Sequence, residues 1–154
     1  METASDYENR MIEAFVGKPE KYKWYKNAFT KFNVNGIDTL KWHWSWWAFF
    51  GNMWFLLYRK AYLAALGLFI LSVIPYVGLL LCILNGGYGT FFVYKAYRNK
   101  KSEIENTISS SDEKTRIETM ALVGGYNQWV IWLYGASVAL VFLICIIFMV
   151  LLGK

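Results

Sequence analysis

Three long stretches of the chain carry no Asp, Glu, Lys or Arg, and they set the expected architecture. These charge-free stretches are 42–58, 61–94 and 119–153. Within the last one, residues 128–152 are apolar on every side of a helix, and the segment begins with Trp129, Trp132 and Tyr134. About 20 apolar residues cross the hydrocarbon core of a bilayer, and aromatic rings favour its interfaces. The pattern predicts a transmembrane helix over 128–152.

The stretch 61–94 is too long for one crossing, because 34 residues would form a helix of about 51 Å. Pro75 lies near its middle and favours a turn. The stretch then divides into a transmembrane hairpin over 56–74 and 78–97, in which each helix also includes a few residues beyond the flanking cations. Cations at both ends place both ends in the cytoplasm by the positive-inside rule.

The stretch 42–58 holds five of the eight tryptophans. Tryptophan favours the headgroup level, whereas a segment at the bilayer centre favours Leu, Ile and Val. As a helix, these 17 residues would reach about 25 Å, short of the hydrocarbon core. An interfacial or re-entrant helix that turns at Gly51-Asn52 is therefore favoured over a full span.

The first 41 residues are expected to form a cytoplasmic amphipathic helical segment (1–41). A short helix over 7–17 would end at Gly17, and a second would run from Pro19 to about Phe32. The second carries an aromatic face. That face could lie on an anionic membrane surface or pack against the rest of the protein, and both interpretations stay open. The face comprises Tyr22, Tyr25, Phe29 and Phe32.

Residues 98–127 are polar enough to form a cytoplasmic connector between the hairpin and the last helix. The hairpin helix should continue to about Ile108, and Ser110 with Glu113 has the form of a capping box for a second short helix. Gly124-Gly125 would end that helix. The expected fold is all-α: a small multi-pass membrane protein with about three transmembrane helices and an interfacial aromatic helix, residues 42–154 forming the membrane domain. The N-terminus would be cytoplasmic and the end at Lys154 extracytoplasmic.

Composition agrees with this architecture. The chain of 154 residues is 56% hydrophobic and only 18% charged, against about 25% charged in a typical soluble domain. A soluble fold of this size could not bury so much apolar surface. The net charge of +5 is spread along the chain without a dominant basic face, which argues against nucleic-acid binding.

The sequence offers little for catalysis. His43 is the sole histidine, and neither Cys82 nor Cys145 has a second ligand at metal-binding spacing. No carboxylate lies within an apolar stretch, and no nucleotide-binding or nucleophile motif is found. We therefore expect no enzymatic activity, no cofactor and no metal site. The polar side chains within the apolar stretches are expected to join helices; they are Asn52, Asn85, Thr90, Asn127, Gln128 and Ser137.

One segment carries a family resemblance. Trp47-Ala-Phe-Phe50 is followed by Trp54, Tyr58-Arg-Lys60 and Tyr62. This pattern resembles the bacterial inner-membrane family catalogued as domain of unknown function 2628, over about residues 14–98. The resemblance implies a small integral protein of the bacterial inner membrane and brings no known activity.

Three functions fit this picture. The leading hypothesis is a non-catalytic accessory or scaffold subunit of a larger inner-membrane complex. The alternatives are an anionic-lipid-binding membrane-stress protein and a small oligomeric transporter or channel. The expected partners are membrane lipids and a protein partner or further copies of the chain within the membrane. The side chains expected to anchor the protein to lipid or partner are Trp44, Trp47, Trp54, Tyr58, Arg59, Lys60 and Tyr62.

Overall fold

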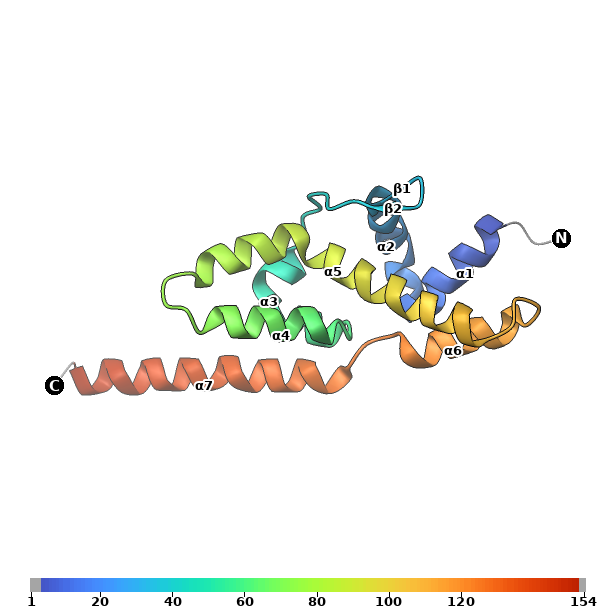
Figure 1. The fold of residues 1–154 in the computed structure, drawn as a ribbon. Coiled ribbons are helices and arrows are strands. Elements are labelled where there is room, and N and C mark those ends of the chain that lie inside the picture. Colours follow the sequence, from blue (N-terminus) through green and yellow to red (C-terminus); the bar gives the residue numbers. More distant parts are fainter. Residues whose placement is uncertain (1–3, 153–154) are drawn as a thin grey trace.

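The computed structural model describes residues 4–152, which form a helical protein with one small β-hairpin (Figure 1). The expected position of Lys154 lies outside the described residues. The all-α class is confirmed. The elements are α1 (Ala4–Val16), α2 (Pro19–Phe32), β1 (Asn33–Val34), β2 (Ile37–Asp38), α3 (Trp46–Tyr58), α4 (Tyr62–Ser72), α5 (Gly78–Thr107), α6 (Glu113–Val123) and α7 (Gln128–Leu152).

The first two helices form where the sequence predicts them. Gly17 separates them at a φ of +64°, a value that glycine adopts without strain. The aromatic face of α2 points into the protein, because Tyr25, Phe29 and Phe32 are all buried. Phe29 stacks on Tyr97 of α5, with ring centroids 5.3 Å apart. Of the two interpretations of this face, packing against the protein's own helices is the one that the structure adopts.

The tryptophan-rich stretch is not one helix. Residues 42–45 are extended and lie along α5, and α3 begins only at Trp46. The turn expected at Gly51-Asn52 is present, since Asn52 has φ 43° and ψ −124° and breaks the helix. Each half of α3 is therefore only about two turns long.

The expected helix over 56–74 is wrong in its bounds. Residues 56–58 belong to α3, and α4 spans only 11 residues. The cause is a Schellman motif at the end of α3: Ala61 N–H donates to Leu56 O and Lys60 N–H donates to Leu57 O. Lys60 takes the left-handed position, with φ +56°, that glycine usually occupies. The second arm does begin at Gly78, and α5 continues as one helix through residue 107.

The second half of the chain follows the predicted order with one shifted cap. Asp112, and not Ser110, caps α6, because its carboxylate accepts from Thr115 N–H at 3.1 Å. Gly124 ends α6 as expected, and α7 spans the predicted residues 128–152. Within residues 4–152, two segments are long and apolar enough to cross a membrane: α5 and the stretch 113–152, whose charge-free part begins at Thr119 and includes all of α7.

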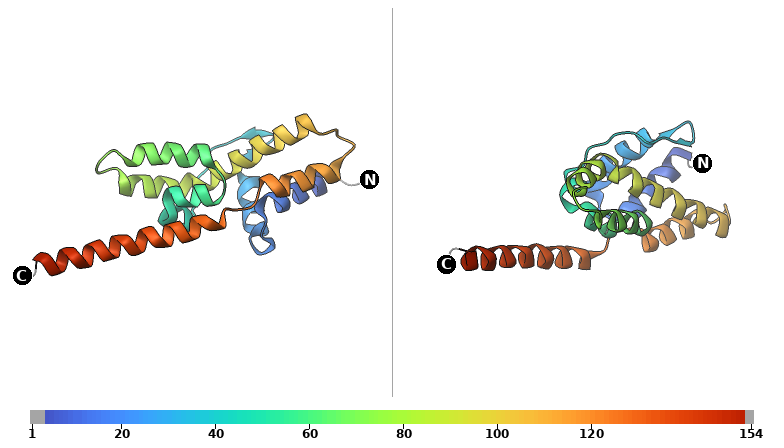
Figure 2. Two further views of the ribbon diagram at one scale, coloured as in Figure 1. Left: turned by 90° about the horizontal axis from the view of Figure 1, so that it is seen from below. Right: turned by 60° about the vertical axis from the view of Figure 1, so that its left-hand side comes forward.

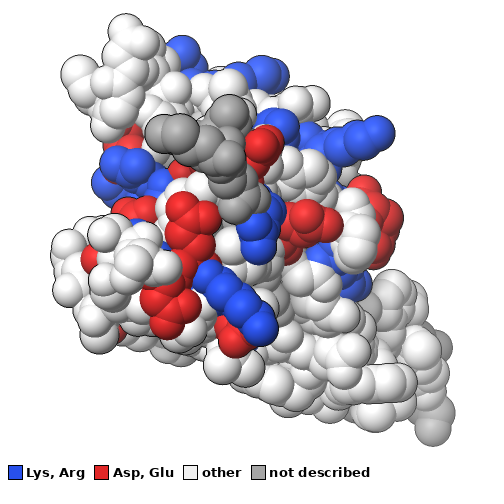
Figure 3. Space-filling model, turned by 90° about the vertical axis from the view of Figure 1, so that its right-hand side faces the viewer, with Lys and Arg blue, Asp and Glu red and all other residues white. Residues whose placement is uncertain are grey.

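Charged and apolar surfaces lie at opposite ends of the molecule. We call the end formed by α1, α2, the β1–β2 hairpin, α6 and the second half of α5 the head. Its charged side chains are visible in Figure 3. The bend between α4 and α5 and the far end of α7 lie at the other end (Figures 1 and 2). The core of the head is aromatic and joins α1, α2 and α5.

Candidate functional site

The extended segment before α3 is held to α5 by main-chain hydrogen bonds. His43 N–H donates to Gly87 O at 2.9 Å, and Ser45 N–H donates to Gly86 O at 2.8 Å. The tryptophan rings lie over these glycines: a Cβ on Gly87 would stand 2.3 Å from the Trp42 ring. The glycine pair in α5 therefore lets the tryptophan segment approach the helix backbone closely.

The break in α3 is stabilised by an asparagine of α5. Asn85 is 2% exposed, and its Nδ2 donates to Ala48 O at 2.8 Å and to Asn52 O at 3.0 Å. The second carbonyl lies where the helix is interrupted, so it needs a hydrogen-bond donor from outside α3. Asn52 Nδ2 in turn donates to Cys82 Sγ at 3.4 Å. As expected from the sequence, these amides join helices.

A second asparagine joins α7 to the end of α3 and the start of α4. Asn127 donates from its backbone N–H to Tyr58 O at 2.9 Å, and from Nδ2 to Leu57 O at 2.8 Å. The same Nδ2 donates to Tyr62 Oη at 3.0 Å. Trp54 lies against Tyr134 of α7, with ring centroids 6.3 Å apart. Trp54, Tyr58 and Tyr62 of the sequence motif therefore meet at the joint between the head and α7.

Arg59 is inside the protein, which differs from its expected role as an exposed anchor. Its side chain is 2% exposed, Nη1 donates to Val16 O at 3.2 Å, and the guanidinium lies 4.4 Å from the Tyr25 ring centroid. Nε and Nη2 are buried without a hydrogen-bond partner. In this position Arg59 cannot reach a lipid headgroup, and it links α3 to α1 and α2 instead.

Two further cations gather around the same joint. Lys18 Nζ lies 4.3 Å from the Tyr126 ring centroid, and Lys100 Nζ donates to Val123 O at 2.8 Å. Within residues 4–152, neither they nor Arg59 form an ion pair with a carboxylate. Aromatic faces and carbonyl oxygens take the place of carboxylates here.

The other expected anchoring residues differ in exposure. Trp47 is 75% exposed and Tyr62 is 53% exposed, so both can contact lipid or a partner. Trp44 and Lys60 are half-buried, Trp44 against Gly86. Trp46 and Phe50, which are not among the expected anchoring residues, are exposed beside Trp47. We call Trp46, Trp47 and Phe50 the aromatic surface of α3.

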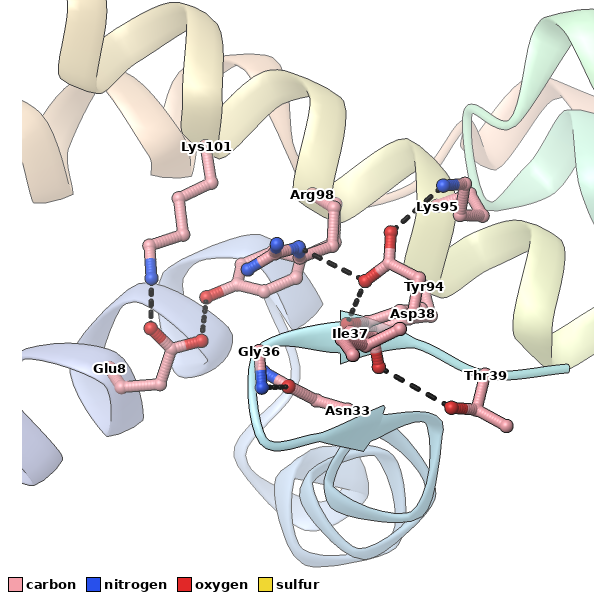
Figure 4. A network of polar contacts seen from close by, with 11 residues as sticks. Glu8, Asn33, Gly36, Ile37, Asp38, Thr39, Tyr94, Lys95, Arg98 and Lys101 are labelled. Atoms are coloured by element: carbon pink, nitrogen blue, oxygen red, sulfur yellow. Dashed lines mark hydrogen bonds and ion pairs between the residues drawn. The ribbon is translucent and has the colours of Figure 1, made fainter. Parts of the chain in front are cut away.

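Two carboxylates that the sequence analysis missed join the outer parts of the head to α5 (Figure 4). Asp38 of the hairpin accepts from Tyr94 Oη at 2.6 Å and from Lys95 Nζ at 2.8 Å. Glu8 of α1 accepts from Tyr97 Oη at 2.8 Å and pairs with Lys101. These partners are far apart in sequence, so no local sequence pattern predicts that they meet.

The charge of Asp38 gives the head a predictable pH dependence. Partial burial alone would raise the pKa of Asp38, but hydrogen bonds from Lys95 and Tyr94 outweigh it and hold the pKa below its ordinary value. Because the folded pKa is the lower one, this contribution to stability is full above about pH 4 and is lost as the pH falls through the folded pKa. We expect Asp38→Asn to cost about 1 kcal/mol at pH 7 and to flatten the acid dependence, measured by denaturant titration.

For that experiment, Asp6→Asn is the matched control, since Asp6 is exposed on α1. An Asp38→Asn protein whose unfolding free energy falls between pH 5 and pH 2 as steeply as that of the unchanged protein would contradict the assignment.

The histidine and the two cysteines of the chain lie apart from one another. Between residues 4 and 152, no group of three or more His, Cys, Asp or Glu side chains is placed to hold a metal ion. The His43 ring lies among Trp24 and Phe32, at centroid distances of 5.0 and 6.1 Å. Cys82 and Cys145 are both free thiols. The distinctive arrangement is therefore the joint between the head and the apolar helices.

Comparison with known proteins identifies the family. No curated protein and no solved structure matches the chain. The family model described as "Protein of unknown function (DUF2628)" matches residues 7–97, which run from α1 to the middle of α5 and include the whole tryptophan-rich motif. The match leaves α6 and α7 outside. The chain therefore belongs to the DUF2628 family of proteins of unknown function.

Proposed function

We propose that this protein is a non-catalytic integral membrane protein that serves as an accessory or scaffold subunit of a larger complex in the bacterial inner membrane. The observation that carries the proposal is the state of α7. It is a charge-free helix of 25 residues whose contacts with the rest of the chain are made chiefly with α3. Of its residues, only Val130 is buried.

The apolar helices of this chain do not close into a bundle. Helix α7 packs on α3, diverges from the α4–α5 hairpin and extends past its bend (Figures 1 and 2). Large side chains along α7 and the hairpin are exposed, among them Leu63 at 83% and Phe148 at 62%. Surfaces of this kind are stable next to lipid or next to the apolar helices of another subunit. The open arrangement leaves room for a transmembrane helix of a partner.

The charged head supports a cytoplasmic location for that end of the molecule. Cations flank the apolar stretches at Arg59, Lys60, Lys95 and Arg98, and all four lie on the head side of the hairpin. Short cation-rich segments next to membrane helices remain on the cytoplasmic side of bacterial inner membranes. The head would then be held at the inner face of the membrane, where it can position partner proteins.

The partner helix is expected to contact the small-residue face of α7. Gly135 and Ala139 are one turn apart and both exposed, and small residues at this spacing let helices approach closely in membranes. We expect Ala139→Phe to release the protein from its complex, because the added ring fills the space that a partner helix needs. The measurement is the mass of the tagged full-length protein, extracted from native membranes in mild detergent.

Leu140→Phe is the matched control, because it places the same ring at the next position of α7, where a large side chain already stands. Release by both substitutions, or a monomeric unchanged protein, would overturn the proposal. In the monomeric case, retention on anionic but not on neutral vesicles would favour the lipid-binding alternative. Solute flux through reconstituted vesicles would favour the transporter alternative.

A further inference from the structure

Three elements at the centre of the molecule are fixed at a common level along the direction of α7. Tyr134 Oη of α7 donates to Phe50 O of α3 at 3.2 Å. Asn85 of α5 donates to Ala48 O and Asn52 O, on either side of Phe50. The middle of α3, Asn85 and Tyr134 are therefore level with one another.

Exposed aromatic rings mark this level as a membrane interface. The aromatic surface of α3 (Trp46, Trp47 and Phe50) lies here, and Trp132 of α7 is 81% exposed one turn or less from Tyr134. Tryptophan rings gather at the headgroup level, where the apolar ring and its N–H group are both accommodated. The aromatic level is therefore the boundary of the hydrocarbon core on the side of the head.

Beyond the aromatic level, α7 and the α4–α5 hairpin extend to very different lengths. Helix α7 continues from Tyr134 to Leu152, which is about 27 Å at 1.5 Å per residue and nearly the roughly 30 Å of the hydrocarbon core. Helix α5 extends from Asn85 back only to Gly78, about 10 Å, and the bend adds a few ångströms. Figures 1 and 2 show α7 running past the bend.

We propose that the α4–α5 hairpin is a re-entrant membrane element. It enters the bilayer from the side of the head, turns near the middle of the hydrocarbon core and returns to the same side, so that α7 makes the single complete crossing. The surface that meets the acyl chains is the exposed apolar side of the hairpin, with Leu66, Phe69, Leu79 and Leu80. This inference rests on the membrane location proposed above.

The composition of the bend agrees with this depth. Residues 73–77 carry no charge, and Val73 and Ile74 are exposed. A bend in the far headgroup layer would contact water and polar groups, and charged residues are common there. Pro75 has no backbone N–H group that would need an acceptor. The Ser72 hydroxyl donates to Phe69 O, so it needs no acceptor from outside the chain either.

The remaining polar groups of the bend indicate which part of the hairpin needs a protein neighbour. Helix α5 begins after Val77 without a side-chain cap, so the N–H groups of its first turn lack a side-chain acceptor. Hydrocarbon cannot accept these hydrogen bonds, and irregular backbone at membrane depth is stable only when protein or water covers it. These N–H groups therefore need acceptors from a neighbouring protein segment or from water at the bend.

Spin-label depth measurements on the full-length protein in vesicles of phosphatidylethanolamine and phosphatidylglycerol test the proposal. One label is placed by Tyr76→Cys in a background of Cys82→Ala and Cys145→Ala. Tyr76 is fully exposed, so its replacement removes no internal contact. In a second variant, which carries only Cys82→Ala, the native Cys145 is labelled as the depth reference, because it is exposed and lies about 16 Å beyond Tyr134 along α7.

We expect the labels at positions 76 and 145 to have similar depths, both accessible to oxygen and protected from a water-soluble nickel chelate. A label introduced by Lys114→Cys in the head should show the opposite pattern. Nickel accessibility at position 76 together with protection at position 145 would overturn the re-entrant hairpin and leave the membrane location standing. Nickel accessibility at position 145 would overturn the membrane location and the hairpin with it.

Discussion

Gly124→Ala is expected to lower the free energy of unfolding by about 2 kcal/mol. A Cβ at this position would stand 2.7 Å from Met120 O, 2.8 Å from Phe15 Cα and 2.9 Å from Phe15 O. All three are backbone atoms, so no side-chain rotation relieves the contact, and α1 must move away from α6. Overpacking of this kind costs about 3 kcal/mol, and the lower chain entropy of unfolded alanine returns up to about 1 kcal/mol.

The measurement is a denaturant titration of tryptophan fluorescence on the full-length protein in mild detergent. Gly67→Ala in α4 is the matched control, because nothing lies within 4 Å of the Cβ it would add and alanine is the better helix former. We expect that control to be neutral or slightly stabilising. Equal stability of the Gly124→Ala protein and the unchanged protein would show that α1 and α6 are not held in this contact.

The position of Gly124 gives the substitution a wider consequence. The next residue, Gly125, donates its N–H to Phe15 O at 2.8 Å, and Asn127 then joins α7 to α3. The chain from 124 to 127 is thus the path by which the head is fixed to the start of α7. If α1 separates from α6, we expect the head to lose its defined orientation relative to the apolar helices.

Local signals in the sequence were sufficient to place several elements. Pro19 and the aromatic repeat after it define α2, and Gly124 ends α6 as predicted. The uninterrupted apolar stretch 128–152 coincides with α7. These are short-range features, in which the residue types of one segment determine its conformation.

The interpretation of Arg59 and Lys60 could not come from the sequence. An Arg-Lys pair after an apolar stretch predicts side chains that extend to the headgroups. Arg59 is buried because Val16 and Tyr25, more than 30 residues upstream, fold over it. Helix α3 ends there because Lys60 adopts a left-handed conformation, which its residue type does not predict. The error in the helix over 56–74 follows directly from this.

The joint between α3 and α5 was only partly predictable. The sequence indicated a turn at Gly51-Asn52 and hydrogen bonding by Asn85 as separate features. Their pairing across about 33 residues depends on the close approach of the chain to Gly86 and Gly87. Small residues in a helix permit such an approach but do not identify the partner.

Asn85→Leu is the second substitution with a large expected effect. Leucine has a similar volume but donates no hydrogen bond, so Ala48 O and Asn52 O lose their partner inside the protein. A buried carbonyl without a partner costs about 1–3 kcal/mol, whereas hydrogen bonds measured within membranes average about 0.6 kcal/mol. Asn85 Oδ1 is itself buried without a partner, so its removal returns part of the loss. The expected net cost is about 2 kcal/mol.

Two further variants separate hydrogen bonding from packing. Asn106→Leu makes the same exchange on an exposed turn of α5, where the side chain has one long hydrogen bond of 3.5 Å, and it should change stability by less than about 0.5 kcal/mol. Asn85→Asp keeps the shape of the side chain, but an ionised carboxylate would place two acceptors against two carbonyl oxygens. A buried carboxyl facing two carbonyls can keep its proton and donate one hydrogen bond, so the comparison is made with the carboxyl ionised, at about pH 9. If donation to α3 is what matters, Asn85→Asp there destabilises the protein at least as much as Asn85→Leu. Tolerance of Asn85→Asp at that pH would mean that the break in α3 is held by packing, and that the amide contributes only its volume.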